Sequence, residues 1–139
     1  MLNVVIDANV VVSAALKPNS IPEKVIRLAR TRGTICLSER ILEEFRLVLS
    51  RPKFSAAVST LRRDEILLLL SAAGRIVTPA EVVRDCRDAK DNIYLEAALE
   101  VPGALIVSGD QDLLELDPWR GTRIMHPAEF VEFVGCSSR

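Results

Sequence analysis

The sequence contains few histidine, cysteine and aromatic residues. Their scarcity argues against a disulfide framework and against a stacking platform for bases. The only histidine, His126, stands at the end of an expected strand, and we interpret it as structural. Three widely separated cysteines are too few for a disulfide framework. Aromatic residues make up 4% of the chain, and Trp119 and Tyr94 are too isolated to form a stacking platform for bases.

Long apolar runs and a strong net charge are also missing. No apolar run approaches the roughly 20 residues that span a bilayer. The longest, from Ile66 to Leu70, is flanked by charged residues and indicates a helix. Because an apolar strand follows Met1 directly, we expect no signal peptide, no membrane association and a cytoplasmic protein. The net charge of −1 does not exclude nucleic-acid binding, since a local basic face can coexist with an acidic site.

The chain of 139 residues, 49% hydrophobic and 27% charged, is long enough for one domain with a substantial core. Short β-branched runs alternate with segments of helical periodicity along its length. The alternation predicts a parallel sheet covered by helices on both faces. The expected strands are 3–7, 34–37, 75–77, 104–108 and 123–125, and the expected helices are 10–16, 21–31, 39–50, 61–73, 91–100, 110–116 and 127–133.

Acidic residues follow two of these expected strands. Asp7 ends the first strand, and Asp110 comes just after the strand at 104–108. Ligands bind at the carboxyl ends of strands in open α/β sheets, and carboxylates gathered there repel one another unless a cation neutralises them. Oxygen-only ligands suit Mg²⁺ or Mn²⁺. The pattern therefore indicates a metal site, although Asp7 is equally well explained as a helix N-cap.

Helical phase distinguishes Glu44 from its neighbour Glu43. Ile41, Phe45 and Val48 lie three or four residues apart and form one apolar stripe. Glu44 is placed beside that stripe, nearer the interior than Glu43. A carboxylate at the edge of a core needs a partner or a cation.

Two further segments carry candidate ligands. Asp91 begins the helix expected at 91–100, where capping and the helix dipole offer an alternative explanation. In the run 108–112, Asp110 and Asp112 are two residues apart and can face one ion across a turn, although one of them could equally cap the following helix. Ser108 can hydrogen-bond a carboxylate or a phosphate.

Taken together, these segments resemble the PIN-domain family of metal-dependent nucleases, and especially its bacterial VapC-type toxins. The resemblance rests on four short motifs in order and on the closing segment 122–130. It covers about residues 4–133. The motifs are an apolar strand with Asp-x-Asn at 4–9, Glu-Glu-Phe at 43–45, Asp-Asn at 91–92 and Ser-Gly-Asp-x-Asp-Leu-Leu at 108–114. The segment 88–90 and the Ile-Tyr pair at 93–94 differ from the residues that are usual at these positions in the family.

The resemblance implies a three-layer α/β/α sandwich with a central, mostly parallel twisted sheet. It implies one nuclease domain over 3–134, with a tail at 135–139. It further implies Mg²⁺ or Mn²⁺ as cofactor, RNA as substrate, a protein antitoxin as partner and a homodimer. The implied quartet of metal-binding catalytic residues is Asp7, Glu44, Asp91 and Asp110, with Asp112 as a further metal-site residue and Asn9 and Ser108 as supporting residues.

The function that this resemblance predicts is hydrolysis of RNA phosphodiester bonds by the toxin of a type II toxin–antitoxin pair. Phosphate affinity would come from basic residues near the cleft, each of which could equally be an ordinary surface charge. These candidates are Arg46, Arg84, Arg87 and Lys90.

Three alternatives were weighed against this prediction. An aspartyl-phosphate phosphatase usually has a second Asp two residues after its nucleophile, where this chain has Asn9. A response-regulator receiver needs an acidic pair beside its first strand. A PIN-fold RNA-binding or interaction module without activity usually lacks part of the quartet, which is complete here. The apolar helix from Leu61 to Leu70 could form a dimer face or be buried within the monomer.

Overall fold

The computed structural model describes residues 2–137 and contains a five-stranded sheet in the order β3-β2-β1-β4-β5. Every pairing between neighbouring strands of this sheet is parallel, as the alternation of elements predicted. The strands are β1 (Leu2–Ile6), β2 (Gly33–Leu37), β3 (Arg75–Ile76), β4 (Leu105–Val107) and β5 (Ile124–Met125).

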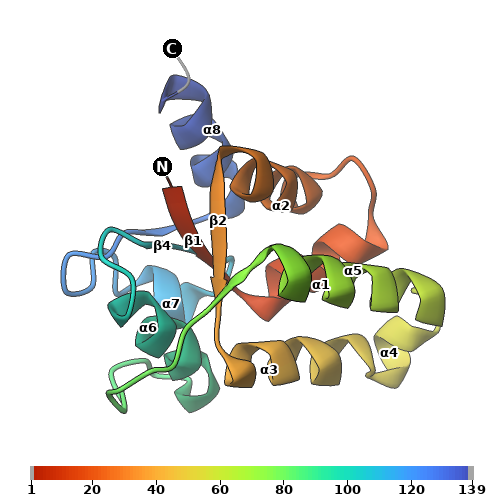
Figure 1. The fold of residues 1–139 in the computed structure, drawn as a ribbon, viewed down its shortest axis with the longest axis horizontal. Coiled ribbons are helices and arrows are strands. Elements are labelled where there is room, and N and C mark those ends of the chain that lie inside the picture. The colour runs from red at the N-terminus through yellow and green to blue at the C-terminus, as the bar shows by residue number, and fades with distance from the viewer. Residues whose placement is uncertain (1, 138–139) are drawn as a thin grey trace.

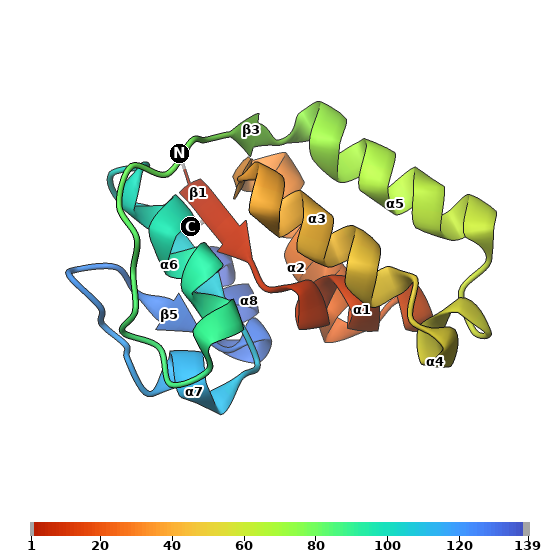
Figure 2. The same cartoon turned by 90° about the horizontal axis from the view of Figure 1, so that it is seen from below.

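Helices cover both faces of this sheet and give three layers (Figures 1 and 2). In Figure 2, α3 and α6 lie in front of β1, while α2 and α8 lie behind it. Among residues 2–137, each helix is too short or too polar to serve as a membrane span. The helices are α1 (Ala8–Leu16), α2 (Ile21–Arg32), α3 (Glu39–Leu49), α4 (Pro52–Ser55), α5 (Thr60–Ala73), α6 (Asn92–Leu99), α7 (Gln111–Leu114) and α8 (Pro127–Ser137), with a 3-10 turn, η1 (Ala89–Asp91), before α6.

Serine residues start three of the longer helices. The hydroxyl oxygens of Ser20, Ser38 and Ser59 each accept a hydrogen bond from a backbone N–H in the first turn of α2, α3 and α5. Such a bond satisfies a donor that the helix itself leaves free.

Gly33 joins α2 to β2 without a connecting loop. It pairs with Leu2 across the sheet, and a Cβ at position 33 would collide with the backbone carbonyl of Leu2. Only glycine therefore permits β1 and β2 to approach this closely at their first residues.

The structure differs from the expected elements mainly at their ends. The last helix, predicted to end at 133, continues to Ser137, and residues 138–139 of the predicted tail lie outside the described part of the chain. A short helix, α4, forms at the start of the segment 53–60, which was expected to be looser. Gly135 costs about 1 kcal/mol relative to alanine inside a helix, yet α8, which packs against α2, continues past it.

The order of the strands determines where a ligand can bind. From β1 the chain proceeds to β2 and β3 on one side of the sheet, and then crosses to β4 and β5 on the other side. Helical crossovers thus leave β1 and β4 in opposite directions, and a crevice opens beyond the carboxyl ends of these two strands. Asp7 and Ser108 are the residues that directly follow β1 and β4.

Candidate functional site

Asp7 lies at this topological switch point, where it is both the N-cap of α1 and a candidate site residue. Its side chain is 2% exposed, and its Oδ1 accepts a hydrogen bond of 3.1 Å from the backbone N–H of Asn9 at the start of α1. Its Oδ2 accepts a second bond, of 2.6 Å, from Oγ of Ser108. The carboxylate is therefore fixed in orientation by β1, α1 and the end of β4.

Tyr94 is a member of this site that the sequence reasoning missed. Its ring is 1% exposed, and its hydroxyl oxygen accepts a hydrogen bond of 3.0 Å from the backbone N–H of Ala8. Burial raises the pKa of Tyr94, and the negative charges of Asp7, Glu44 and Asp91 raise it further. The Tyr94 hydroxyl thus lies close to three of the four carboxylates of the predicted quartet.

Asp91 occupies the end of η1 and the beginning of α6, and it is 4% exposed. Oxygen atoms of Asp91, Asp88 and Asp110 all lie within 4.8 Å of one another. Among the side-chain atoms of the described residues, Oδ2 of Asp91 is buried without a hydrogen-bond partner. An unpaired carboxylate oxygen in such a place costs stability unless a cation or a proton compensates it.

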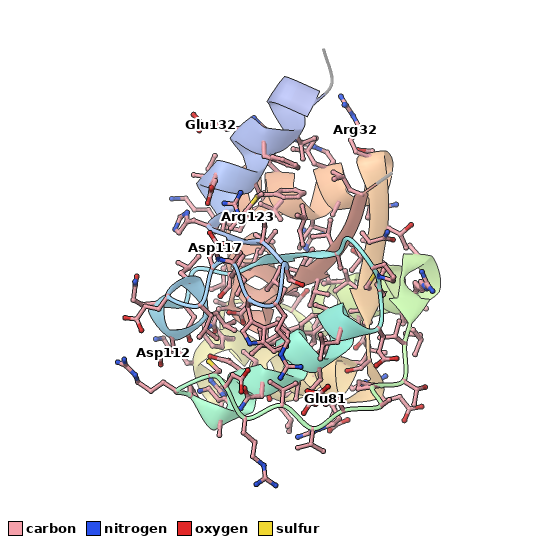
Figure 3. The ribbon with its side chains drawn as sticks, turned by 90° about the vertical axis from the view of Figure 1, so that its left-hand side faces the viewer. Arg32, Glu81, Asp112, Asp117, Arg123 and Glu132 are labelled. Carbon is pink, nitrogen blue, oxygen red and sulfur yellow. The ribbon has the colours of Figure 1, made fainter. Side chains whose placement is uncertain are left out.

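Asp110 reaches this group from the turn between β4 and α7. Its backbone N–H donates to Oγ of Ser108 at 2.9 Å, and its Oδ1 accepts from the backbone N–H of Asp112 at 2.8 Å. Asp110 is therefore the N-cap of α7 as well as a neighbour of Asp91. Asp112, on α7 in Figure 3, forms an ion pair of 3.9 Å with Arg87.

The pKa values of the two buried aspartates, Asp91 and Asp7, rise for the same physical reasons. Burial raises the pKa of Asp91 to about 8, and the neighbouring carboxyl groups of Asp110, Asp7 and Asp88 raise it further. Burial also raises the pKa of Asp7, although hydrogen bonds from Ser108, Asn9 and Tyr94 act in the opposite direction. Negative charge is thus concentrated in a poorly solvated place, which a divalent cation would relieve.

Glu44 and Glu43 have the different surroundings that helical phase predicted. Glu43 is exposed and forms an ion pair of 3.7 Å with Arg46, whereas Glu44 is half-buried on the side of α3 that faces Tyr94. Glu44 does not belong to the close group formed by Asp88, Asp91 and Asp110.

Asn92 and Glu96 hold the loop that carries Asp88 over the site. The carboxamide of Asn92 accepts from the backbone N–H of Cys86 at 2.8 Å and donates to the carbonyl of Ala89 at 3.2 Å. Buried Glu96 accepts from the backbone N–H of Val83 at 2.9 Å. Both side chains come from α6, so the helix that begins at Asp91 also fixes the loop before it.

The far side of the same loop is tied to the turn before β5. Asp85 accepts a hydrogen bond of 2.8 Å from Nε1 of buried Trp119, and Arg120 forms an ion pair of 2.6 Å with Glu81. Asp117 and Arg123, labelled side by side in Figure 3, hold this turn together through two hydrogen bonds. These bonds lower the pKa of Asp117.

With this geometry established, the comparisons with known proteins identify the chain. A sequence profile of the PIN domain matches residues 3–112. The chain belongs to the PIN-domain family. It is 34% identical over 117 residues to the uncharacterized protein MJ1680 of Methanocaldococcus jannaschii, covering 83% of this chain and 75% of that protein.

Two crystal structures share the PIN-like α/β/α fold of this chain at low sequence identity. PAE2754 from Pyrobaculum aerophilum has a TM-score of 0.63 and 13% identity, with 97% of this chain and 90% of that chain covered. VapBC2 from Rickettsia felis, bound to a DNA fragment from their promoter, has a TM-score of 0.60 and 14% identity, with 90% and 98% covered. The predicted family and fold class are thereby confirmed.

The carboxylates of this PIN domain fit a divalent cation on structural grounds. The close group offers oxygen atoms alone, and its member Asp91 has one oxygen, Oδ2, that is buried and without a hydrogen-bond partner within residues 2–137. Hard cations such as Mg²⁺ and Mn²⁺ prefer such ligands. Asp88, a member of the group, was not among the predicted ligands. Its position three residues before Asp91 in a tight turn is the signal that could have revealed it.

The predicted phosphate-binding residues fall in different places around the PIN domain. Arg87 and Lys90 lie beside the acidic group and form ion pairs with Asp112 and Asp88, respectively. Arg46 is on α3, paired with Glu43, and Arg84 is exposed on the loop before η1. Of these four basic residues, Arg87 and Lys90 are therefore the two that form ion pairs with acidic residues at the candidate site.

Proposed function

We propose that this PIN domain is a metal-dependent endoribonuclease that hydrolyses RNA phosphodiester bonds with Mg²⁺ or Mn²⁺. The observation that carries the proposal is the unpaired Oδ2 of buried Asp91. The same carboxyl group has an oxygen within 4.8 Å of carboxylate oxygens from Asp88 and Asp110 at the switch point of the sheet. A site that only maintained the fold would not leave this oxygen without a partner.

The proposed metal ligands are Asp91, Asp110 and Asp88, with Asp7 and Glu44 completing the acidic site from β1 and α3. When bound, a divalent cation makes water acidic enough to attack a phosphate at neutral pH and stabilises charge on the phosphate and the leaving oxygen. The chain's own residues orient the carboxylates. Ser108 and Tyr94 hold Asp7, and Ser108 also accepts the backbone N–H of Asp110.

Asp112, Asn9 and the basic residues have supporting roles in this proposal. Asp112 and the backbone of Asn9 support Asp110 and Asp7 through N–H donors at 2.8 and 3.1 Å. Arg87 and Lys90 bring positive charge to the acidic rim, where RNA phosphates would otherwise be repelled.

The proposal is tested by incubating purified protein with a mixed RNA pool and Mg²⁺ or Mn²⁺, with and without EDTA. Asp91→Asn is compared with Asp64→Asn, which makes the same substitution at an exposed position on α5. We expect cleavage by the wild type and by Asp64→Asn, and none by Asp91→Asn or in EDTA.

Binding of Mn²⁺, followed by electron paramagnetic resonance, accompanies each assay. Folded wild type that binds Mn²⁺ but cleaves no RNA would overturn the nuclease proposal in favour of an RNA-binding or interaction module. Cleavage that survives Asp91→Asn would overturn the assignment of the site.

We further propose that the protein is the toxin of a type II toxin–antitoxin pair and acts in the cytoplasm, where cellular RNA is located. The likeness to VapBC2, a pair of proteins bound to their promoter DNA, supports a partner protein for this chain. Expression of the wild type should arrest growth, and expression of Asp91→Asn should not. Normal growth of cells that express protein active in RNA cleavage would contradict the toxin proposal and leave the nuclease proposal intact.

We also propose a homodimer, for which α5 is the candidate surface. Ile66 and Leu70 of this helix are buried within the monomer, whereas Leu61 and Leu68 are 72% and 68% exposed. The helix thus packs one side into the monomer and exposes two large leucine side chains on another side, among charged residues. Light scattering should give twice the monomer mass for the wild type and the monomer mass for Leu68→Glu.

A further inference from the structure

A pocket of about 360 Å³ adjoins the acidic group on the side of α1 and α8. Its walls come from the first residues of α1, α2 and α8 and from the turn after β4. Asp110 lines the pocket and also belongs to the carboxylate group, so the two sites share a wall. A molecule held at the carboxylates can therefore extend directly into the pocket.

The walls of this pocket are mostly apolar. Ile21 and Pro22 contribute from the start of α2, and Pro127 and Ala128 from the start of α8. Ile21 is 44% exposed, so part of its aliphatic side chain is accessible to a molecule in the pocket. Small-molecule sites typically combine such apolar walls with a few polar groups that orient the ligand.

His126 supplies both a ring and a hydrogen-bond donor to the pocket. Its Nδ1 accepts a hydrogen bond of 3.3 Å from the backbone N–H of Ala128, so the neutral ring carries its proton on Nε2. The side chain is exposed, whereas the rings of Trp119 and Tyr94 are buried and closed to a ligand. Imidazole rings stack on nucleic-acid bases in the same way as other aromatic side chains.

Asn9 and Ser13 supply the remaining polar groups, one turn apart on the exposed side of α1. Asn9 uses its backbone N–H to bind Asp7, while within residues 2–137 its carboxamide has no hydrogen-bond partner. An amide and a hydroxyl at helical spacing can pair with the polar edge of a base or with a ribose hydroxyl.

We propose that this pocket binds one nucleoside of the RNA chain, next to the phosphate held at the carboxylates. The base stacks on His126 against the apolar walls, and Asn9 and Ser13 bind its polar edge. The pocket then sets which nucleotide stands beside the cleaved bond. This inference rests on the proposed nuclease function, because the shared wall at Asp110 is what makes the occupant continuous with a bound phosphate.

The test uses the full chain with two pocket variants and one control. Ala128→Trp fills the pocket from an exposed position in the first turn of α8. His126→Asn removes the ring but keeps an acceptor for the backbone N–H of Ala128, since asparagine is a good N-cap. Ala57→Trp places the same indole on an exposed position just after α4, away from the pocket.

Cleavage of short RNA oligonucleotides that differ at one position beside the cut is measured for each protein. We expect KM to rise at least tenfold in Ala128→Trp and the nucleotide preference to shrink in His126→Asn, with Ala57→Trp unchanged. Mn²⁺ affinity should stay within twofold of wild type in all three. Unchanged KM and preference in both pocket variants would overturn the inference and leave the nuclease proposal standing.

A second measurement works without cleavage. 5′-AMP, GMP, CMP and UMP are titrated into ¹⁵N-labelled protein, and backbone amide shifts are followed by NMR. Shifts at Ser13, Gly109 and Ala128 that disappear in Ala128→Trp would support the pocket even if no RNA substrate were cut. No shift at these amides with any of the four mononucleotides would overturn it.

Discussion

Ser108 donates a hydrogen bond of 2.6 Å from Oγ to Oδ2 of Asp7, although the two residues are 101 positions apart in the chain. The pairing of β1 with β4 brings them together, because Ile6 lies opposite Val107 in the parallel register. Ser108 is itself fully buried. The bond thus links the ends of the two strands between which the proposed site lies.

Ser108→Ala should therefore destabilise the protein. A buried hydrogen bond to a carboxylate contributes roughly 1.5–3 kcal/mol, and its loss removes the Ser108 partner of Oδ2 of Asp7 and of the backbone N–H of Asp110. The free energy of unfolding from urea denaturation should fall by about that amount. Ser55→Ala, at an exposed position on α4, should change it by less than about 0.5 kcal/mol. Equal effects of the two substitutions would contradict the role given to Ser108.

Tyr94→Phe should destabilise the first turn of α1 and so lower the stability of the protein. The substitution keeps the buried ring but removes the hydroxyl that accepts the backbone N–H of Ala8. Leaving this donor unpaired should cost about 1–3 kcal/mol of stability, measured by thermal or urea unfolding. Since the hydroxyl also binds Asp7, Mn²⁺ affinity should fall as well. Wild-type stability in Tyr94→Phe would show that water replaces the hydroxyl.

The metal-free protein should lose stability as the pH rises from about 4 towards 8. Burial and neighbouring carboxylates raise the folded-state pKa of Asp91 to about 8, above its ordinary value of 3.8. In that window the folded state binds more protons than the unfolded state, so deprotonation favours unfolding. One such proton changes the free energy of unfolding by up to ~1.4 kcal/mol per pH unit.

Urea denaturation in EDTA at several pH values measures this dependence. Asp91→Asn should flatten the slope, because an amide does not titrate. Asp64→Asn, exposed on α5, should leave the slope as in the wild type. A stability that rises through this window in the wild type would contradict the raised pKa of Asp91.

Mn²⁺ should stabilise the folded protein and should bind more tightly as the pH rises. A ligand that binds only the folded state adds about 2.7 kcal/mol at one hundred times its Kd, and the ion must displace the proton on Asp91. Calorimetric titration at pH 6, 7 and 8 measures the affinity. Asp88→Asn should weaken it at least tenfold, since Asp88 belongs to the close group of carboxylates. An unchanged affinity in Asp88→Asn would remove this residue from the proposed ligands.

The alternation of short apolar strands with amphipathic segments was sufficient to predict the parallel sheet and its helical layers. Apolar residues recur at different spacings in strands and in helices, so each element can be predicted from its local sequence. Most helices were predicted at about the right place for the same reason. The end of α8 was missed, because Gly135 and the residues after it predict a tail, whereas the helix continues to Ser137.

Only some residues of the candidate site could be predicted from the sequence. Asp7, Asp91 and Asp110 could be selected because they follow strands or begin helices, where a parallel sheet places its ligands. Tyr94 could not be selected, since its role depends on which residues face it in three dimensions, and Asp88 had only its spacing from Asp91 to indicate it. A loop aspartate and a helix tyrosine have the same local sequence features whether or not they lie at a site.

The sequence by itself determined the class of fold, the family and the oxygen-rich chemistry of this protein, because these follow from local periodicity and residue type. The tertiary structure alone decided which carboxylates meet, which oxygen of Asp91 is left unpaired and where His126 points. These are relations between segments that may be a hundred residues apart, as Asp7 and Ser108 are, and only the crossing of the chain at β1 and β4 brings them within hydrogen-bond distance.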